Sequence, residues 1–265
     1  RERSRKMDDI LREAEGLLHS GVKEMMLLGQ NVNSYGTGTQ DSFPKLLRAL
    51  DALGVPRIRF MTSHPKDLSD ELIDAMATSP HICSHLHLPV QSGNNEILSA
   101  MNRRYTREQY LDKVQKLRSA MPEIGLTTDI IVAFPGETEA QFEDTLRLVS
   151  EVGYDAAFTF IYSKREGTAA AKMEDQVPRE VSGERLNRLL AEVEASTKRA
   201  HLQMIGKTEL VLVEALSKRD ATQVSGKGRR NITVTLDGTE TDIGQIVPVR
   251  ITSAAVNTLR AERTK

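Results

Sequence analysis

The sequence feature that most constrains the fold is a regular alternation of short apolar runs with amphipathic helical stretches, up to about residue 200. Apolar side chains recur at helical spacing at residues 7–20, 42–53, 69–77, 94–101, 106–120, 139–152 and 182–203. Five apolar runs suited to buried strands lie between them, at residues 24–29, 57–61, 84–88, 126–132 and 156–161. Strands that alternate with helices in this way predict parallel βαβ units.

Two α/β architectures fit this alternation. Five strands behind an opening helix fit an α/β barrel that lacks its first strand. A doubly wound open sheet has the same local pattern, because periodicity reports each element and not the order of the strands in the sheet. Both architectures stay open on the sequence alone.

The sequence changes character after Gly206. Short β-rich segments follow at residues 208–215, 231–236, 245–251 and 255–261, separated by turn residues at 225–228 and 237–238. Four or five short strands in so few residues predict a small barrel of the oligonucleotide-binding kind. We therefore expect two domains, residues 1–202 and 203–265.

Composition excludes several classes of protein. The single cysteine excludes a disulfide framework and any metal or iron–sulfur site built from this chain's own thiolates. The formal net charge of −1 gives no whole-chain argument for nucleic-acid binding. However, residues 203–265 carry 10 Lys and Arg against 7 Asp and Glu, whereas the preceding residues carry 26 against 30. No apolar run approaches the roughly 18 residues of a membrane span, so no membrane partner is expected.

Polar residues and glycines gather where the five predicted strands end. In parallel α/β folds, ligands bind at the carboxyl ends of the strands. The segments concerned are residues 29–35, 62–65, 89–93, 134–138 and 162–165, and Asp129 lies within the fourth strand. Together they predict one pocket that is rich in amide, hydroxyl and backbone donors and suits a polar small molecule.

Each of these features also has a purely structural interpretation. Tight turns and helix caps would explain Gly29, Gly93, Gly136, Asn31, Asn33, Asn94 and Asn95. His85 and His87 share one face of a strand and have no acidic cluster nearby, so we expect core packing rather than metal binding. Cys83 is expected to be a half-buried, inert thiol. Either solvation or pairing with a carboxylate would suit Arg103, Arg104, Lys164 and Arg165.

The spacing of residues shows no hydrolytic triad, no P-loop and no Rossmann glycine fingerprint. The nearest signal is Gly36-Thr37-Gly38, which precedes a helical stretch but lacks the third glycine.

Five segments in one order carry a resemblance to a known family. They read LLGQNVNSY at residues 27–35, TSHPKD at 62–67, HLPVQSG at 87–93, FPGET at 134–138 and YSKREGT at 162–168. Together they resemble the radical S-adenosylmethionine methylthiotransferases. The first segment is similar to the tRNA-modifying branch rather than to the branch that acts on a ribosomal protein. Residues 1–5 look like the stretch just after the family's cluster loop, and residues 206–265 are similar to its TRAM domain.

This resemblance implies a partial (βα)6-type radical SAM barrel without its first strand, followed by a TRAM-like β-barrel. The implied activity is transfer of a methylthio group to C2 of an adenosine next to the anticodon, usually one that carries an isopentenyl group. The implied partners are a tRNA anticodon stem-loop and an electron-donor protein, and we expect a monomer. Residues 216–219 look like those of organellar members, which favours a mitochondrial over a cytoplasmic location.

The resemblance also implies site residues. The expected S-adenosylmethionine contacts are Gly29, Gln30, Ser63, Gln91, Ser92, Asp129, Gly136, Glu137, Tyr162 and Arg165. The guanidinium of Arg103, Arg104 or Arg165 would pair with the cofactor's carboxylate or with an RNA phosphate. The expected RNA contacts are Lys218, Arg219, Lys227, Arg229 and Arg230. Ala133 departs from the family, which usually has glycine there, and its methyl group is expected to tighten the pocket wall.

The larger departure concerns cysteines. The family needs a Cys-x3-Cys-x2-Cys loop for one [4Fe-4S] cluster and three further cysteines for a second. Clusters require thiolate ligands, and Cys83 cannot replace three of them. We therefore expect a truncated chain that is inactive alone and holds no metal, from a complete protein that carries both clusters.

Two other functions remain as alternatives. The first is a non-catalytic paralogue that binds tRNA or S-adenosylmethionine without turnover. The second is an unrelated barrel lyase or aldolase, which would need a Schiff-base lysine or metal-binding carboxylates at the strand ends. Only Lys164 lies near such a place in the predicted fold.

Overall fold

The computed structural model describes residues 3–61, 63–218, 220 and 222–264. Arg1, Glu2, Thr62 and Arg219, which the sequence analysis used, lie outside the described residues. The first domain carries the helices α1 (Met7–His19), α2 (Phe43–Ala52), α3 (Asp70–Thr78), α4 (Asn95–Ala100), α5 (Arg107–Ala120), α6 (Glu139–Val152) and α7 (Arg179–Leu202). Its strands are β1 (Met25–Leu27), β2 (Ile58–Phe60), β3 (His85–His87), β4 (Gly125–Val132) and β5 (Ala156–Ile161).

Local sequence sets where most of these helices begin. The Ser69 side chain accepts a hydrogen bond from Leu72 N at the start of α3. Thr106 and Thr138 each form a capping box with the glutamine three residues later, at the starts of α5 and α6. A cap satisfies amide donors that have no partner within the helix, so these starts depend on local residues and not on distant packing.

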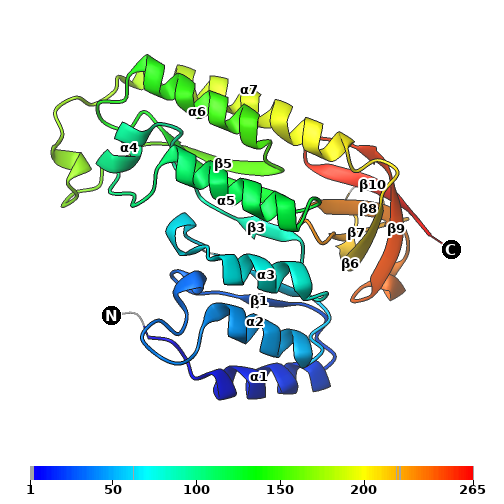
Figure 1. The fold of residues 1–265 in the computed structure, drawn as a ribbon. Helices are drawn as coiled ribbons and strands as arrows, with labels where there is room; N and C mark the ends of the chain where they lie inside the picture. Colours follow the sequence, from blue (N-terminus) through cyan, green and yellow to red (C-terminus); the bar gives the residue numbers. More distant parts are fainter. Residues whose placement is uncertain (1–2, 62, 219, 221, 265) are drawn as a thin grey trace.

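The parallel strands follow each other in chain order. β1 pairs with β2, and β3 pairs with β4, which pairs with β5. A parallel bridge between Ile58 and Ile82 joins the two groups, and Cys83 N donates to the Ile58 carbonyl at 2.9 Å. A doubly wound sheet would reverse its strand order at a switch point. The sequential order therefore selects the partial barrel between the two architectures that the sequence left open (Figure 1).

The second domain is a closed five-stranded barrel with the strand order β10-β8-β7-β6-β9. Its strands are β6 (Thr208–Leu216), β7 (Gln223–Lys227), β8 (Thr233–Asp237), β9 (Ile246–Ala254) and β10 (Thr258–Arg263). The small barrel is confirmed, but the assignment of residues 225–228 to a turn was wrong for Ser225, Gly226 and Lys227, which belong to β7. A Cβ on Gly226 would lie 2.0 Å from the Leu212 carbonyl oxygen, so this glycine permits close strand approach rather than a turn.

Each domain has its own hydrophobic core. Buried members of the first core run from Ala14 to Val193, and those of the second run from Met204 to Ala261. His85 and His87 are buried in the first domain, as expected. Cys83 is only 2% exposed, so the expectation of a half-buried thiol was wrong, and burial raises the thiol pKa.

The second domain packs against the amino ends of the parallel strands. Arg57 and Arg59 in and beside β2 are almost fully buried, and both donate to Glu24 Oε2, at 2.8 and 2.9 Å. Their remaining guanidinium nitrogens donate to backbone carbonyls of the second domain, at Leu210, Lys227, Gly228 and Arg229. The carboxyl ends of the same strands, where ligands bind in such folds, point away from this contact (Figure 1).

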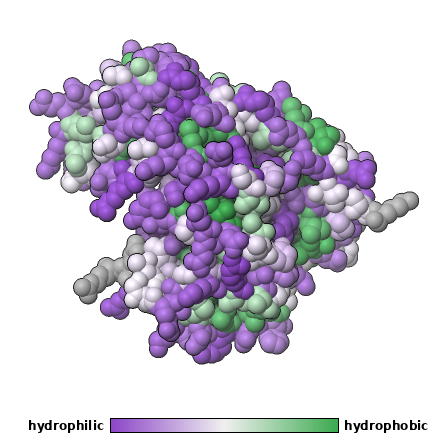
Figure 2. All heavy atoms as spheres, in the orientation of Figure 1, coloured by the Kyte–Doolittle hydropathy of each residue, from purple (hydrophilic) through white to green (hydrophobic). Residues whose placement is uncertain are grey.

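The molecular surface in Figure 2 is mostly hydrophilic, with hydrophobic patches near the middle of the face shown and over the second domain. None of the helices in the described ranges is both long and apolar enough to cross a membrane.

Candidate functional site

The inner face of the partial barrel carries most of the candidate site. Side chains alternate along β4, so Leu126, Thr128, Ile130 and Val132 are buried beneath the helices, while Thr127, Asp129 and Ile131 face inward. Parallel pairing sets Phe158 beside Asp129 and Phe160 beside Ile131. The inner face thus combines one carboxylate with apolar and aromatic side chains.

A cavity of about 600 Å³ opens at the carboxyl ends of β3, β4 and β5. It is lined by Gln91, Asp129, Tyr162 and Arg165 of the predicted site, and by residues that the prediction did not include, among them Asn102, Phe160 and Ala170. Its size lies within the range of small-molecule sites. We call this cavity the mouth cavity.

The mouth cavity contains polar groups without partners. The Tyr162 hydroxyl and Arg103 Nε are buried and have no hydrogen-bond partner among the described residues. The Tyr162 ring packs edge-on against Phe134, with centroids 5.2 Å apart, which fixes the direction of the hydroxyl. Burying a polar group without a partner costs about 1–3 kcal/mol, so these two groups favour a polar ligand in the cavity.

Gln91 has a strained backbone at the edge of the same cavity. Its φ is +70°, a conformation that residues with a side chain rarely adopt. Two backbone hydrogen bonds of 2.9 Å hold it there, from Gln91 N to the Asp129 carbonyl and from Ile131 N to the Gln91 carbonyl. Strain of this kind tends to persist where it serves a binding site.

A hydrogen-bonded chain runs beneath Asp129. His85 Nε2 and His87 Nδ1 both lie 3.0 Å from Thr127 Oγ1, and His87 Nε2 lies 3.5 Å from Asp129 Oδ1. The Asp129 carboxylate can only accept, so the contact places the Nε2 edge of the His87 ring toward it, while Thr127 Oγ1 joins the two imidazole rings. Burial, together with the cation Arg59, lowers the pKa of His85 to about 3, so it stays neutral.

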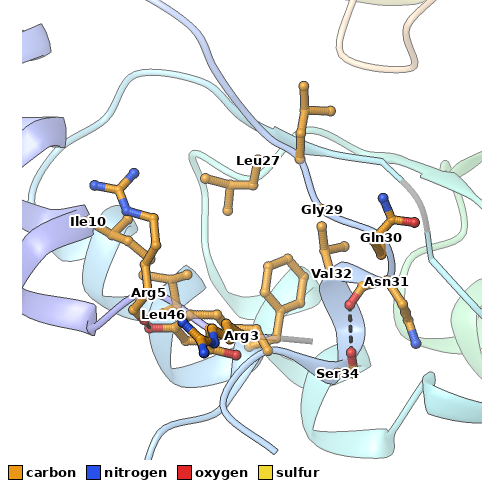
Figure 3. A pocket seen from close by; sticks show the side chains of 14 residues that line it. Arg3, Arg5, Ile10, Leu27, Gly29, Gln30, Asn31, Val32, Ser34 and Leu46 are labelled. Atoms are coloured by element: carbon orange, nitrogen blue, oxygen red, sulfur yellow. Dashed lines mark hydrogen bonds between the residues drawn. The ribbon is translucent and has the colours of Figure 1, made fainter. Parts of the chain in front are cut away.

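A second cavity, of about 360 Å³, holds Gly29 and Gln30 at the end of β1 (Figure 3). Leu27, Val32 and Phe43 line it on the apolar side, and Arg3 and Arg5 lie at its edge. Near Gly29, Asn31 Oδ1 and both side-chain polar atoms of Asn33 are buried and have no partners within the described ranges. Gly29 and Gln30 are therefore not brought into the mouth cavity, although both cavities lie at the carboxyl ends of strands.

Four predicted cofactor residues line neither cavity. Ser92 is fully buried, and its hydroxyl lies 3.4 Å from Thr145 Oγ1. Gly136 has φ +80° and donates its N–H to the Asp175 carbonyl, which makes it a turn residue. Ser63 Oγ is buried, and no described residue pairs with it. Glu137, described next, is also buried, and the cofactor role of all four stays a prediction.

Glu137 links the loop after β4 to α7. Its Oε2 accepts from Ala133 N at 2.7 Å and from Arg185 Nη1 at 3.0 Å. Burial raises the pKa of this carboxyl group, and the Ala133 amide and the Arg185 guanidinium oppose the shift. The geometry gives Glu137 a structural role in holding the loop that carries Phe134.

Most of the predicted RNA contacts lie at the junction of the domains. Arg229 Nη2 donates to the carbonyls of Pro80 and Ile82, and Arg230 pairs with the buried Asp155. Lys227 Nζ donates to the Asn231 carbonyl and to Thr233 Oγ1. Lys218 is exposed, and Arg219 lies outside the described residues. The side chains of Lys227, Arg229 and Arg230 already make hydrogen bonds or ion pairs within the protein. The RNA role of all five residues stays a prediction.

The site fits an organic cofactor better than it fits a metal cluster. The mouth cavity has the volume and the unpartnered donors that suit a polar ligand such as S-adenosylmethionine. Among the described residues, no His, Cys, Asp and Glu side chains gather in a group that could hold a metal ion. The one cysteine is buried beside β2, so this chain supplies no set of thiolates for a cluster.

Sequence reasoning missed two groups of residues. Phe158 and Phe160 alternate along β5 with Thr159 between them, which is a period-two signal that the apolar run concealed. Arg57 and Arg59 flank Ile58 with the same period, and two charges on one face of a predicted buried strand indicate buried partners.

Comparison with known proteins identifies the class. Residues 1–149 match the radical SAM superfamily, and the chain belongs to it. Residues 202–263 match the TRAM domain, which corresponds to the closed barrel. The superfamily is defined by S-adenosylmethionine and [4Fe-4S] chemistry. Coproporphyrinogen III oxidase from Escherichia coli, described as a radical SAM enzyme, shares the fold with a TM-score of 0.52 and 14% identity, over 97% of this chain and 65% of that one.

Individual relatives are more specific. The chain is 52% identical, over 99% of its length, to a tRNA-2-methylthio-N(6)-dimethylallyladenosine synthase of Alkaliphilus oremlandii, and covers 56% of that protein. It is 51% identical over 99% of its length to the protein of the same name from Clostridium novyi, of which it covers 59%. The chain therefore spans little more than half the length of these relatives. The family resemblance seen in the sequence is confirmed.

Proposed function

We propose that this chain is the C-terminal part of a tRNA methylthiotransferase, which adds a methylthio group to C2 of an N6-dimethylallyladenosine beside the anticodon. The observation that carries the proposal is the mouth cavity, with its unpartnered Tyr162 hydroxyl, in a chain that also holds a TRAM-type barrel. The identity of 51–52% to synthases of that name supports it.

The residues of the mouth cavity would bind and orient S-adenosylmethionine. The Asp129 carboxylate, oriented by His87, suits the hydroxyl groups of a ribose, since a carboxylate accepts hydrogen bonds from two neighbouring hydroxyls. The Tyr162 hydroxyl and the Arg103 Nε–H supply donors for polar atoms of the ligand. Arg165, at the exposed edge, suits the ligand's carboxylate. When bound beside a reduced cluster, S-adenosylmethionine supplies radical chemistry through cleavage of its sulfonium.

The clusters would be held by parts of the protein other than these residues. The chain has one cysteine, and that thiol is buried with a raised pKa, which disfavours the thiolate that iron needs. We therefore propose that the chain alone does not turn over. An electron-donor protein and the anticodon stem-loop of tRNA are the proposed partners of the complete enzyme.

Cofactor binding can be tested on the chain itself. Isothermal titration calorimetry with S-adenosylmethionine should show binding to the wild-type chain. Tyr162→Phe, which removes only the hydroxyl, and Asp129→Asn should each weaken it about 5- to 100-fold, because one hydrogen bond to a charged or buried group is worth about 1–3 kcal/mol. Thr241→Val, on the far barrel, is the matched control. No binding to the wild-type chain would refute the assignment of the mouth cavity.

Turnover separates the enzyme from a binding paralogue. Incubation of the chain with dimethylallylated tRNA, S-adenosylmethionine, iron, sulfide and a reductant should give no methylthiolated nucleoside and no [4Fe-4S] absorbance. The chain should then be extended by the segment encoded upstream of it in the same reading frame. If that segment carries a Cys-x3-Cys-x2-Cys loop, the extended protein should show both the methylthiolated nucleoside and the [4Fe-4S] absorbance. A frame without such cysteines would reject the enzyme and favour a paralogue that only binds.

A further inference from the structure

Two aromatic side chains on β5 are exposed side by side on the inner face. Phe158 is 54% exposed and Phe160 is 52% exposed, in a chain with only six phenylalanines and no tryptophan. Two residues along a strand span about 6.6 Å and point to the same face. Two large rings that are open to water lose the stabilisation that burial would give. Their exposure therefore indicates a surface that binds a ligand.

The two rings lie between the mouth cavity and a third cavity at the junction of the domains. Phe160, Asp129 and Ile131 line the mouth cavity, while Phe158 and Thr127 line the junction cavity, which measures about 580 Å³. Because Phe158 and Phe160 are neighbours on one face, the two cavities follow each other along β4 and β5. A ligand that covers both rings would thus be elongated and would run from the mouth toward the TRAM barrel.

The groups around the rings select the chemistry of this ligand. The mouth cavity presents Arg103 and Arg165, and the junction cavity presents Asn231 and Asn257. Lys227 and Arg230 also line the junction cavity, where they contribute positive charge, although Lys227 donates within the second domain and Arg230 pairs with Asp155. Within the junction cavity, His201 Nε2 and Arg230 Nε are buried without partners in the part of the chain that the structure describes. A purely apolar protein segment would cover the rings but would leave these donors unsatisfied.

Single-stranded RNA satisfies both requirements. Bases have flat faces that stack on phenylalanine, and phosphates between them pair with lysine and arginine. Successive bases of an extended strand lie at a separation similar to that of the two rings. The His87 ring contacts Phe158 edge-on, with centroids 5.9 Å apart, and so holds that ring in one orientation for stacking.

We propose that Phe158 and Phe160 are a stacking platform for two consecutive unpaired bases of the substrate RNA, which leads the strand from the TRAM barrel to the mouth cavity. This rests on the proposed function only in taking RNA as the substrate. It differs from a phosphate contact of the barrel, because stacking depends on aromatic faces and not on charge.

The test is RNA affinity, measured without S-adenosylmethionine. The probe is a fluorescein-labelled anticodon stem-loop RNA with an adenine-rich loop. Its binding to the full chain is measured by fluorescence anisotropy. Phe158→Ala and Phe160→Ala should each weaken binding about 5- to 100-fold, the range for loss of one base–aromatic stack. Phe158→Tyr and Phe160→Tyr should retain wild-type affinity, since tyrosine keeps the aromatic face.

Leucine substitutions separate stacking from simple apolar contact. Phe158→Leu and Phe160→Leu keep an apolar side chain but lose the aromatic face, so they should bind RNA as weakly as the alanine variants. Leu17→Ala, at an exposed leucine of α1, is the matched control and should not change affinity. Both rings are exposed, so the variants should keep the circular dichroism spectrum of the wild type.

Several outcomes would overturn the proposal. Unchanged RNA affinity in both alanine variants would do so while leaving cofactor binding and the proposed function intact. Full affinity in the leucine variants would replace stacking by nonspecific apolar contact. If the alanine substitutions instead convert a wild-type dimer to a monomer in sedimentation and leave RNA affinity unchanged, the platform is an interface between copies of the chain. A wild-type chain that binds S-adenosylmethionine but no RNA would also overturn it.

Discussion

At the scale of single residues, Ala133 shows how the backbone conformation of one position sets a physical cost. Its φ is +59°, in the left-handed region, and its N–H donates to Glu137 Oε2 in a buried loop. A glycine would adopt this conformation without steric cost. Ala133 lines neither strand-end cavity, so the expected tightening of the pocket wall stays a prediction.

Ala133→Gly should stabilise the protein. An alanine in the left-handed region costs about 1–2 kcal/mol, and part of that gain is offset by the greater freedom of glycine in the unfolded chain. We expect a net increase of about 1 kcal/mol in the free energy of unfolding, measured by urea denaturation. Gly153→Ala is the reverse control, because Gly153 has φ +64° and no atom within 4 Å of an added Cβ. The free energy of unfolding of Gly153→Ala should fall by about 1 kcal/mol. A fall in the free energy of unfolding of Ala133→Gly as well would contradict the strain at Ala133.

His85 gives a pH dependence with a definite sign. Its pKa is lowered from 6.5 to about 3, first by burial and then by Arg59, His87, Arg230 and Lys227. The unfolded chain therefore binds a proton between these values that the folded chain does not. The contribution of His85 to stability is complete above pH 6.5 and falls as the pH drops toward 3, by up to about 1.4 kcal/mol per pH unit.

The measurement is urea denaturation of the wild type and of His85→Gln at several pH values from 7 down to 4. The carboxylates titrate in both proteins and contribute equally to the pH dependence of their free energies of unfolding. His85→Gln has no titrating ring, so its free energy of unfolding should fall less steeply than that of the wild type across this range. Parallel curves for the two proteins would mean that His85 takes up its proton at the same pH in the folded and unfolded states, which would contradict the lowered pKa.

At the scale of elements, local signals determined what could be predicted. The helices α5 and α6 begin where Thr106 and Thr138 cap them, and these residues are visible in the sequence. The order of the strands depends on pairs such as Ile58 and Ile82, whose contact no local pattern encodes. β7 was missed because a glycine such as Gly226 is typical of a turn. The structure instead requires a glycine there because the Leu212 backbone of the neighbouring strand lies too close for a side chain.

The candidate site shows the same limit. Strand-end loops could be placed at one edge of the sheet from the sequence, but not divided between two cavities. A run such as Arg229-Arg230 reads as charge available to RNA, and nothing local reveals that Pro80, Ile82 and Asp155 accept its hydrogen bonds. Charge is a property of the residue, whereas its availability is a property of the fold.

The contact made by β2 should determine how the domains unfold. Arg57→Met together with Arg59→Met leaves Glu24 without its cations and removes the donors to Gly228 and its neighbours. Breaking a buried ion pair costs about 3–5 kcal/mol. We expect the single unfolding transition of the wild type to separate into two in the double variant. Circular dichroism and calorimetry would measure these transitions. Arg48→Met, which breaks the exposed pair with Asp74 and an exposed hydrogen bond to Thr78 Oγ1, should change stability by about 1 kcal/mol or less. One unshifted transition in the double variant would contradict the coupling.

At the scale of the whole molecule, the parallel strands have a different task at each end. The mouth cavity lies at their carboxyl ends, and the TRAM-type barrel is fixed to their amino ends through Arg57, Arg59 and Asp155. The exposed rings of β5 lie on the face between these two ends. The second domain is therefore a structural part of the first, and not only a separate RNA-binding module joined by a linker.

Removal of residues 203–265 should consequently destabilise the domain that remains. Arg57 and Arg59 would lose four carbonyl acceptors, and Asp155 would lose Arg230, whose charge opposes the effect of burial on the Asp155 carboxyl pKa. Water would replace these partners, and a hydrogen bond to a charged group is worth about 1.5–3 kcal/mol net, so we expect residues 1–202 to lose about 3 kcal/mol or more in urea denaturation. Loss of tRNA binding on truncation would then reflect unfolding as well as missing contacts. Lys218→Ala, at an exposed position with the barrel retained, isolates the contact, and it should reduce the salt dependence of binding without changing stability. A truncated domain with undiminished stability would show that the buried arginines find other partners and that the two domains fold independently.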